Sequence, residues 1–268
     1  MHKYSEQLLL PYPHEGWATA YPYIPKQFKF EPSDTEYLYQ ANLQRQPQHW
    51  YYRTHEVTYT WNSNGYRASE WADVDWSSSW VIMGCSFVAG IGLAYEDTLG
   101  EQLSRILKEP VVNLGMGGSS IDVAMYNTAR LIDKNIRPKG VIIVTPNLNR
   151  MTYWKEQSYV SLIPTNPAPD NYIDGAYRGW IRYEPNAELH GYLKLRGTIS
   201  MWAAEGIQPH VAYIDKTYDP THTIGLHLPP HQDFARDVDV VNGQTQGHFG
   251  RATQASWARA LAEVIQNT

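Results

Sequence analysis

The sequence holds a single cysteine, Cys85, among its 268 residues, so no disulfide can form within the chain. Positive charge is also scarce and dispersed, with 22 Lys and Arg against 27 Asp and Glu and a net charge of −5. A nucleic-acid backbone requires clustered basic side chains to replace its counterions. We therefore expect no nucleic-acid partner for this protein.

Long apolar runs are absent as well. No stretch approaches the roughly 20 apolar residues that a membrane span needs. The first 13 residues contain only the run Leu8 to Leu10, which is too short for the apolar core of a secretory signal. We therefore expect no membrane partner and a cytoplasmic location, with a virion component or a mature secreted form left open. The oligomeric state cannot be predicted from these features.

Phenylalanine is scarce among the aromatic residues, with 5 Phe against 20 Tyr and 10 Trp. Tyr and Trp combine a large apolar face with a polar group, which suits wet binding surfaces and the faces of sugars. A surface rich in amphipathic aromatic side chains with no particular ligand explains the composition equally well. The aromatic content is therefore compatible with a carbohydrate ligand but does not require one.

The first part of the chain, residues 1–75, differs in composition from the rest. It is rich in Tyr, Trp, Pro, Gln and His and has no sustained helical period. Tyr59 and Trp61 alternate with polar residues, and Asn64-Gly65 then predicts a turn because both residues tolerate positive φ. We interpret residues 1–75 as an extended arm or small β-rich lobe that packs on a main domain at residues 76–268.

The main domain alternates short apolar runs with helical patterns. The runs of strand length lie at residues 80–84, 111–115, 141–144 and 210–214. Apolar residues at helical spacing predict helices within residues 99–107, 121–132, 191–205 and 257–265. This alternation predicts a parallel sheet covered on both faces, and hence a three-layer α/β/α fold. Residues 153–190 and 215–247 show no such pattern, and we expect them to be irregular.

Ligands of open parallel sheets bind outside the carboxyl ends of the strands. The first strand is followed by Gly84, Cys85 and Ser86. A serine on a tight turn between strand and helix presents its hydroxyl at the sheet edge, beside the free N–H groups of the helix start. Such a glycine-rich loop could instead hold a phosphate, but the lysine of a P-loop and the G-x-G-x-x-G spacing are both missing.

Three further segments add polar groups at the same edge. After the second strand, Gly118 could bring a backbone N–H close to a substrate oxygen, or simply form a turn. After the third strand, the amide of Asn149 could donate to an oxyanion, or bond to its own backbone. His248 opens the last helix and could accept the proton of Ser86, although a lone histidine there is more often structural.

In order and spacing, these segments resemble the four blocks of the SGNH (GDSL-like) serine hydrolases over residues 58–266. The second block resembles "VVNLGMGGSS", and the last block resembles "HFGRATQASWARALAEVI". A stretch like "NSNGYR" precedes the Ser block in many members of the carbohydrate-esterase-like and phage-encoded branches. The resemblance implies a flavodoxin-like, mostly parallel sheet and an esterase that needs no cofactor. It implies Ser86 as nucleophile, His248 as base, and an oxyanion hole from the backbone N–H groups of Ser86 and Gly118 and the amide of Asn149.

The implied substrate is a small-molecule or polysaccharide ester, with O-acetyl groups on a carbohydrate favoured over long-chain lipids. An O-acyltransferase would use the same Ser86 and His248. A non-catalytic carbohydrate-binding or virion structural module on the same fold is the other alternative.

The chain departs from the family pattern at three positions. The family's aspartate usually lies three residues before the histidine, where this chain has Thr245. Asp237 is the first candidate to orient His248 and Asp239 the second, and a dyad oriented by a backbone carbonyl is also possible. Cys85 replaces the usual Asp before the serine, and Arg150 replaces the Asp of the third block. We expect the side chains of Arg150, Cys85 and His231 to line the substrate site.

The sequence offers two competing sites. Cys85 could itself be a nucleophile, but a buried cysteine more often serves as a small apolar side chain. Three histidines, His222, His227 and His231, could bind zinc, but their spacing follows no tight ligand motif. We therefore expect no metal site.

Overall fold

The computed structural model describes residues 9, 26–155, 158–163, 171–181, 184–214, 225–229, 233–241 and 244–268. Its centre is a five-stranded sheet in the order β4-β3-β5-β8-β9, with every neighbouring pair parallel. The strands are β3 (Trp80–Gly84), β4 (Val111–Gly115), β5 (Gly140–Thr145), β8 (His210–Tyr213) and β9 (Leu226–His227). Numbered along the chain, this order is 2-1-3-4-5, which is the flavodoxin-like arrangement.

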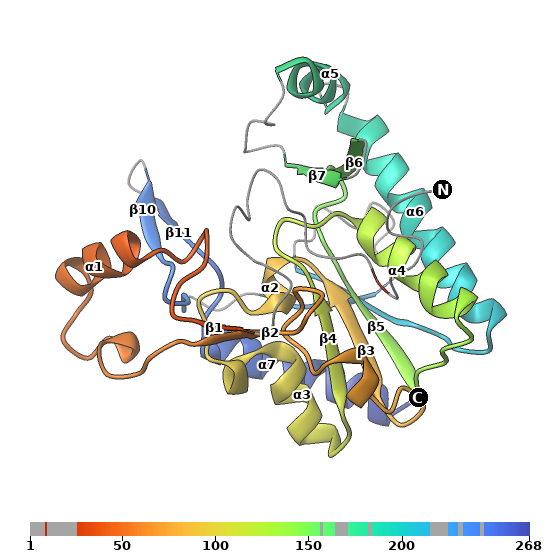
Figure 1. Cartoon of the computed structure of the whole chain (residues 1–268), viewed down its shortest axis with the longest axis horizontal. Coiled ribbons are helices and arrows are strands. Elements are labelled where there is room, and N and C mark those ends of the chain that lie inside the picture. The colour runs from red at the N-terminus through yellow and green to blue at the C-terminus, as the bar shows by residue number, and fades with distance from the viewer. Residues whose placement is uncertain are drawn as a thin grey trace.

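Helices cover both faces of this sheet (Figure 1). Val81 and Met83 of β3 belong to a core shared with α4 (Ile121–Asp133) and α6 (Glu184–Ala204). The alternate residues Trp80 and Ile82 belong to a second core, shared with α3 (Leu99–Leu107) and α7 (Arg251–Gln266). Successive strand residues point to opposite faces, so an uninterrupted apolar strand needs a helical layer on each side. The three-layer α/β/α prediction is confirmed.

The prediction that residues 153–190 are irregular is wrong. A hairpin of β6 (Met151–Lys155) and β7 (Ser158–Leu162) is followed by α5 (Asn171–Ile181), and α6 begins at Glu184. Pro185 lies in the first turn of α6, where the helix leaves backbone N–H groups unpaired in any case. A proline at this position is therefore compatible with the helix.

The expected long loop at residues 215–247 also contains strands. β9 adds a fifth strand to the sheet, and β10 (Asp239–Val241) pairs with β11 (Gln244–Gln246) as an antiparallel hairpin. All three residues of β11 are exposed and polar. A strand that buries no apolar face gives no alternating pattern, so the sequence carried no signal for it.

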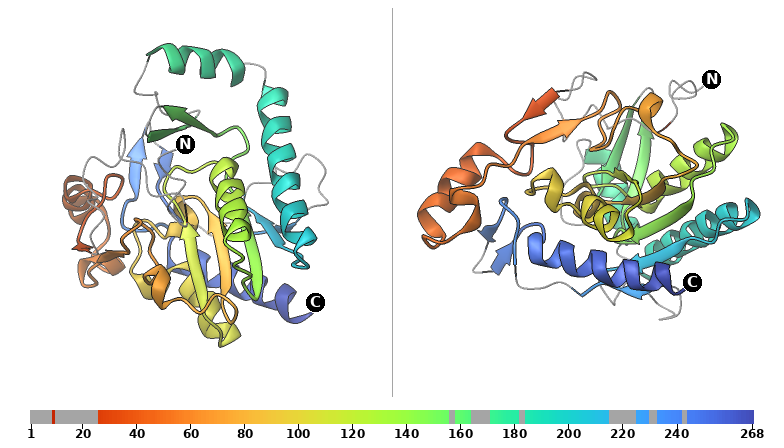
Figure 2. Two further views of the ribbon diagram at one scale, coloured as in Figure 1. Left: turned by 45° about the vertical axis from the view of Figure 1, so that its right-hand side comes forward. Right: turned by 90° about the horizontal axis from the view of Figure 1, so that it is seen from below.

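The N-terminal part of the described chain combines one helix with a short strand pair. β1 (Lys26–Phe28) pairs antiparallel with β2 (Tyr59–Trp61), and α1 (Glu36–Arg45) lies between them in sequence. In both views of Figure 2, α1 lies beside the β10–β11 hairpin. Short 3₁₀ helices occur at Tyr51–Arg53, Trp71–Asp73 and Tyr95–Asp97.

One apolar cluster joins this N-terminal part to the main domain. It buries Tyr52, Val57, Tyr59 and Trp61 against Ala89, Ile91, Leu93 and Ala235. Three of the latter residues follow the first sheet strand, so the N-terminal part packs at the carboxyl edge of the sheet. None of the helices in the described ranges is long and apolar enough to cross a membrane.

Candidate active site

Ser86 is the first residue of α2 (Ser86–Ala89), a single helical turn that follows β3 after Cys85. Two glycines make this turn possible. A Cβ added to Gly84 would lie 2.5 Å from a methyl group of Val88, and Gly90 ends the helix with a φ of +73°. The Ser86 side chain is therefore presented at the carboxyl edge of the sheet by its own neighbours in sequence, with 9% of the residue exposed.

The loops after β4 and β5 meet the same strand end. The hydroxyl of Ser119 donates to the carbonyl of Gly84 at 3.0 Å, and Gly118 before it has a φ of +69°. Arg150, after β5, donates from Nη1 to the carbonyl of Ser119 at 3.5 Å. The loop after β4 thus contacts the strand that leads into Ser86, and the loop after β5 contacts the loop after β4.

Asn149 is fixed by contacts on both sides of its backbone. Its N–H donates to the Oδ1 of Asn147 at 2.8 Å, and its carbonyl accepts from the hydroxyl of Tyr177 in α5, also at 2.8 Å. Asn149 is 7% exposed, and its Oδ1 is buried without a hydrogen-bond partner. Tyr177 lies in the stretch that we expected to be irregular, so its support of this loop was not predicted.

His248 and Asp237 form a close pair. The Nδ1 of His248 lies 2.5 Å from one carboxylate oxygen of Asp237, and the backbone N–H of His248 donates to the other at 3.1 Å. The imidazole also meets the ring of Phe87 edge-on, with the centroids 5.3 Å apart. This contact places His248 beside the residue that follows Ser86. Asp239, the second candidate, instead pairs at the surface with Arg45 at 2.9 Å.

His248 lies eleven positions after Asp237, and the strands β10 and β11 lie between them. The two strands pair with each other, from Asp239 with Gln246 to Val241 with Gln244, so the chain returns to the base of the hairpin before His248. Phe234 and Phe249 form an antiparallel bridge there, and the N–H of Ala235 donates to the carbonyl of His248 at 2.8 Å. Thr245, at the usual family position, lies exposed on β11.

The surroundings of His248 raise its pKa above the ordinary value for histidine. Burial disfavours the charged imidazolium, but the carboxylate of Asp237 and its hydrogen bond outweigh that effect. Glu31 raises the pKa further and Arg150 lowers it. Because Asp237 engages Nδ1, the Nε2 nitrogen is the one left to exchange a proton with a neighbouring group.

A cavity of about 230 Å³ is lined by Cys85 and Phe87, the residues on either side of Ser86 in the chain. Its walls are Cys85, Phe87, Thr145, Pro146, Asn147, Arg150, Ile214 and Phe249. It therefore lies at the carboxyl ends of β3 and β5, where the strand order reverses, which is the usual ligand position in such sheets. The rings of Phe87 and Phe249 stack with their centroids 4.9 Å apart. The Oγ1 atom of Thr145 and the Nε atom of Arg150 are buried without a hydrogen-bond partner.

The cysteine and histidines that the sequence offered as alternative nucleophile or metal ligands do not come together in one site within the described residues. Cys85 is a buried free thiol in the cavity wall. His227 contacts the ring of Tyr213 at the end of the sheet, whereas His222 and His231 lie outside the described residues. Within the part of the chain that the structure describes, no group of three or more His, Cys, Asp or Glu side chains could hold a metal ion.

The "NSNGYR" motif supports the loop that follows Ser86. The buried guanidinium of Arg67 donates to the carbonyls of Gly90 at 2.6 Å and Leu93 at 3.1 Å, and lies over the ring of Tyr59. The Oδ1 of Asn62 accepts from two backbone N–H groups of the turn that leads to Arg67. The resemblance gave this motif no role, and its contacts are structural.

No protein-family model matches the chain, and no curated protein is similar to it in sequence. Solved structures do show a likeness. A lipolytic G-D-S-L family protein from Veillonella parvula is 12% identical, with a TM-score of 0.41 over 71% of this chain and 99% of its own. An acetyl xylan esterase from Butyrivibrio proteoclasticus is 11% identical, with a TM-score of 0.41 over 72% of this chain and 65% of its own.

A carbohydrate acetylesterase from Sinorhizobium meliloti is 13% identical, with a TM-score of 0.37 over 71% of this chain and 99% of its own. At these identities and TM-scores, each is a likeness that carries no conclusion about what this chain does. The assignment of chemistry rests on the geometry around Ser86, His248 and Asp237.

Proposed function

We propose that this protein is a serine esterase that hydrolyses short acyl esters, with O-acetyl groups on a carbohydrate as the substrate class. The observation that carries the proposal is the Asp237–His248 pair, held against Phe87 at the turn that presents Ser86. A carboxylate, an imidazole and a hydroxyl in this order are the parts of an activated serine nucleophile.

The proposed reaction proceeds through an acyl-enzyme. His248 removes the proton of Ser86 through Nε2, and the Oγ of Ser86 attacks the ester carbonyl carbon. The backbone N–H groups of Ser86 and Gly118 and the amide of Asn149 hold the resulting oxyanion. The tetrahedral intermediate then expels the alcohol, which takes its proton from His248. Water attacks the acyl-enzyme by the same steps, releasing the acid and restoring Ser86.

The cavity lined by Cys85 and Phe87 supports a short acyl group as part of the proposal. A volume of about 230 Å³, walled on one side by the stacked rings of Phe87 and Phe249, suits a small group better than a long chain. Arg150 and Thr145 contribute unpaired polar atoms to the same wall, and we propose that they hold a polar part of the substrate. The abundance of Tyr and Trp favours a carbohydrate as the alcohol.

The direct test is hydrolysis of 4-nitrophenyl esters from acetate to octanoate by the wild type and three variants. We expect Ser86→Ala and His248→Ala to abolish turnover, and Cys85→Ala to retain it because the thiol only lines the cavity. Activity that is lost in Cys85→Ala and kept in Ser86→Ala would assign the nucleophile to the thiol.

The substrate class needs a separate measurement, namely acetate release from O-acetylated xylo-oligosaccharides. A wild type that cleaves the nitrophenyl esters but releases no acetate would keep the esterase and reject the carbohydrate substrate. Transfer of the acyl group to an added sugar, detected by mass spectrometry, would instead indicate an acyltransferase. A wild type inactive in all three assays would favour the binding or structural module.

A further inference from the structure

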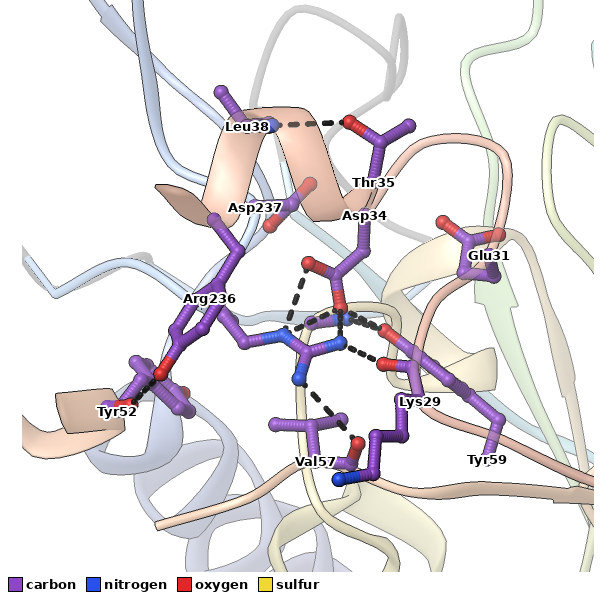
Figure 3. A network of polar contacts seen from close by, with 12 residues as sticks. Lys29, Glu31, Asp34, Thr35, Leu38, Tyr52, Val57, Tyr59, Arg236 and Asp237 are labelled. Atoms are coloured by element: carbon purple, nitrogen blue, oxygen red, sulfur yellow. Dashed lines mark hydrogen bonds and ion pairs between the residues drawn. The ribbon is translucent and has the colours of Figure 1, made fainter. Parts of the chain in front are cut away.

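A buried ion pair connects the N-terminal part of the chain to the loop of Asp237. The guanidinium of Arg236, directly before Asp237, contacts the carboxylate of Asp34 through three N–O distances of 2.7 to 3.1 Å. Their side chains are 4% and 0% exposed. Arg236 also donates to the carbonyls of Lys29 and Val57, so its charge is enclosed by N-terminal residues (Figure 3).

A second contact brackets Asp237 itself. The amide nitrogen of Asn42, in α1, donates to the carbonyl of Arg236 at 3.1 Å and to that of Val238 at 2.6 Å. These carbonyls belong to the residues immediately before and after Asp237, and Asn42 is 1% exposed. One N-terminal side chain therefore holds the backbone on both sides of the residue that contacts His248.

The same network reaches the loop that follows Ser86. The hydroxyl of Tyr59 donates to Asp34 at 2.5 Å and accepts from the N–H of Gly92 at 2.8 Å. The carbonyl of Gly92 in turn accepts from the N–H of Arg236 at 2.9 Å. Asp34, Tyr59, Gly92 and Arg236 thus form a closed ring of contacts that fixes the acid loop against the nucleophile loop.

We infer that Asn42 and Asp34 are positioning residues for the reaction, which hold Asp237 against His248 from outside the α/β domain. This inference rests on the proposed esterase function. The chain between Asp237 and His248 contains a hairpin, so the short local connection found in the family does not fix the carboxylate here. The contacts of Asn42 and Asp34 take its place, and they make the N-terminal part a component of the catalytic site.

The first test compares Asn42→Ala with Arg45→Gln. Both residues lie on α1 and contact the same segment, but Arg45 pairs with Asp239 at the exposed surface. We expect Asn42→Ala to lower kcat by roughly 10- to 100-fold with little change in KM, because small misplacements of a catalytic group are costly. Arg45→Gln should stay within about twofold, as is typical of exposed ion pairs.

A merely structural role is separated by repeating Asn42→Ala in an Asp237→Asn background. If Asn42 acts through Asp237, the added substitution should have almost no further effect on kcat. An equal loss of kcat in both backgrounds would overturn the inference. Asn42→Ser, which keeps a shorter hydrogen-bond donor, serves as the second variant if Asn42→Ala does not fold.

A titration of ¹⁵N-labelled histidine by NMR tests the inference without turnover. The charges around His248 are Asp237 and Glu31, which raise its pKa, and Arg150, which lowers it. We expect Asn42→Ala to lower the pKa of His248, because part of the Asp237 interaction is lost, while Arg45→Gln leaves it unchanged. An unchanged pKa in Asn42→Ala would overturn the inference. A chain that shows the shift but hydrolyses no ester would reject the proposed function alone.

Discussion

Ser86 and Asp237 reach the same edge of the sheet by different means. Ser86 follows β3 almost directly, and its turn is shaped by Gly84 and Gly90 within four residues of it. Asp237 lies on a loop whose main anchor, the Asp34–Arg236 pair, joins residues 202 positions apart. Ser86, the proposed nucleophile, is therefore placed by local sequence, whereas Asp237, the proposed acid, is placed by contacts that exist only when distant parts of the chain have packed together.

Substitutions near Ser86 and substitutions near Asp237 should therefore affect the site in different ways. A change near Ser86 acts on a turn that the sheet holds in place, because β3 is hydrogen-bonded on both sides. A substitution in α1 or at Asp34 affects the position of Asp237 but removes no contact within the sheet. The site thus has two halves, namely the turn of Ser86 held by the sheet and the loop of Asp237 held by the N-terminal part, and substitutions can test each half separately.

The largest effect is expected from Asp237→Asn. The amide keeps the shape of the carboxylate but removes its charge, and in a comparable triad this change lowers kcat by about 10⁴-fold. With the carboxylate gone, burial is left to lower the pKa of His248. Since the base must be neutral, the acid limb of the kcat/KM profile should move to lower pH. Loss of activity with an unmoved acid limb would show that Asp237 does not set the pKa of His248.

Asp239→Asn is the matched control for this substitution. Asp239 is the other candidate acid from the same segment, and its carboxylate pairs with Arg45 at the surface. We expect its kcat/KM profile to match that of the wild type.

Gly92→Ala should be the next most damaging change, because Gly92 lies where the two halves meet. Its φ is +75°, and an added Cβ would lie 2.6 Å from the Cβ of Ala235 and 2.8 Å from Oδ1 of Asp237. We expect kcat to fall by about 10²-fold as the carboxylate is displaced. Gly206→Ala is the control, since it has a φ of +77° with open space around it. Equal kinetic effects of the two substitutions would attribute the loss to backbone strain.

The site residues that directly follow strands of the sheet are also the ones that the sequence could predict. Ser86 and Gly118 follow apolar runs that end where strands β3 and β4 end, so the pattern placed both at the sheet edge. Asn149 was found by its place after the third strand, and His248 by its place at the start of the last helix. Asp237 could be named as a candidate, but the exposed, polar strand β11 gave no sign of the hairpin that lies between it and His248.

The roles of Asp34 and Asn42 could not be found from the sequence, because a lone acidic or amide residue in an aromatic-rich segment has no periodicity that marks it as buried. The alternation around Tyr59 indicated a strand but not the hydrogen bonds of its hydroxyl. Asp34 and Asn42 contact Arg236 across 202 and 194 positions of the chain, and Tyr59 contacts Gly92 across 33.

The stability of the long-range half can be measured without substrate. Asp34→Asn leaves the buried guanidinium of Arg236 without its carboxylate, and breaking one side of such a pair costs about 3 to 5 kcal/mol. Arg45→Gln removes an exposed pair from the same region and should cost at most about 1 kcal/mol. Urea denaturation curves of the two variants against the wild type give both values. Equal destabilisation would mean that the buried pair is not the main anchor of the acid loop.

The smallest effects are expected from the two charges that flank His248 from opposite halves. Arg150 follows β5 and lowers the pKa of His248, whereas Glu31 belongs to the N-terminal part and raises it. Arg150→Gln should therefore move the acid limb of kcat/KM to higher pH, and Glu31→Gln should move it to lower pH. Each shift should be smaller than that of Asp237→Asn, because neither charge hydrogen-bonds the imidazole. Shifts of the same sign would mean that one of these side chains acts by moving His248 and not by its charge. The pH profile of the double variant distinguishes the two cases, because opposite shifts should largely cancel in it.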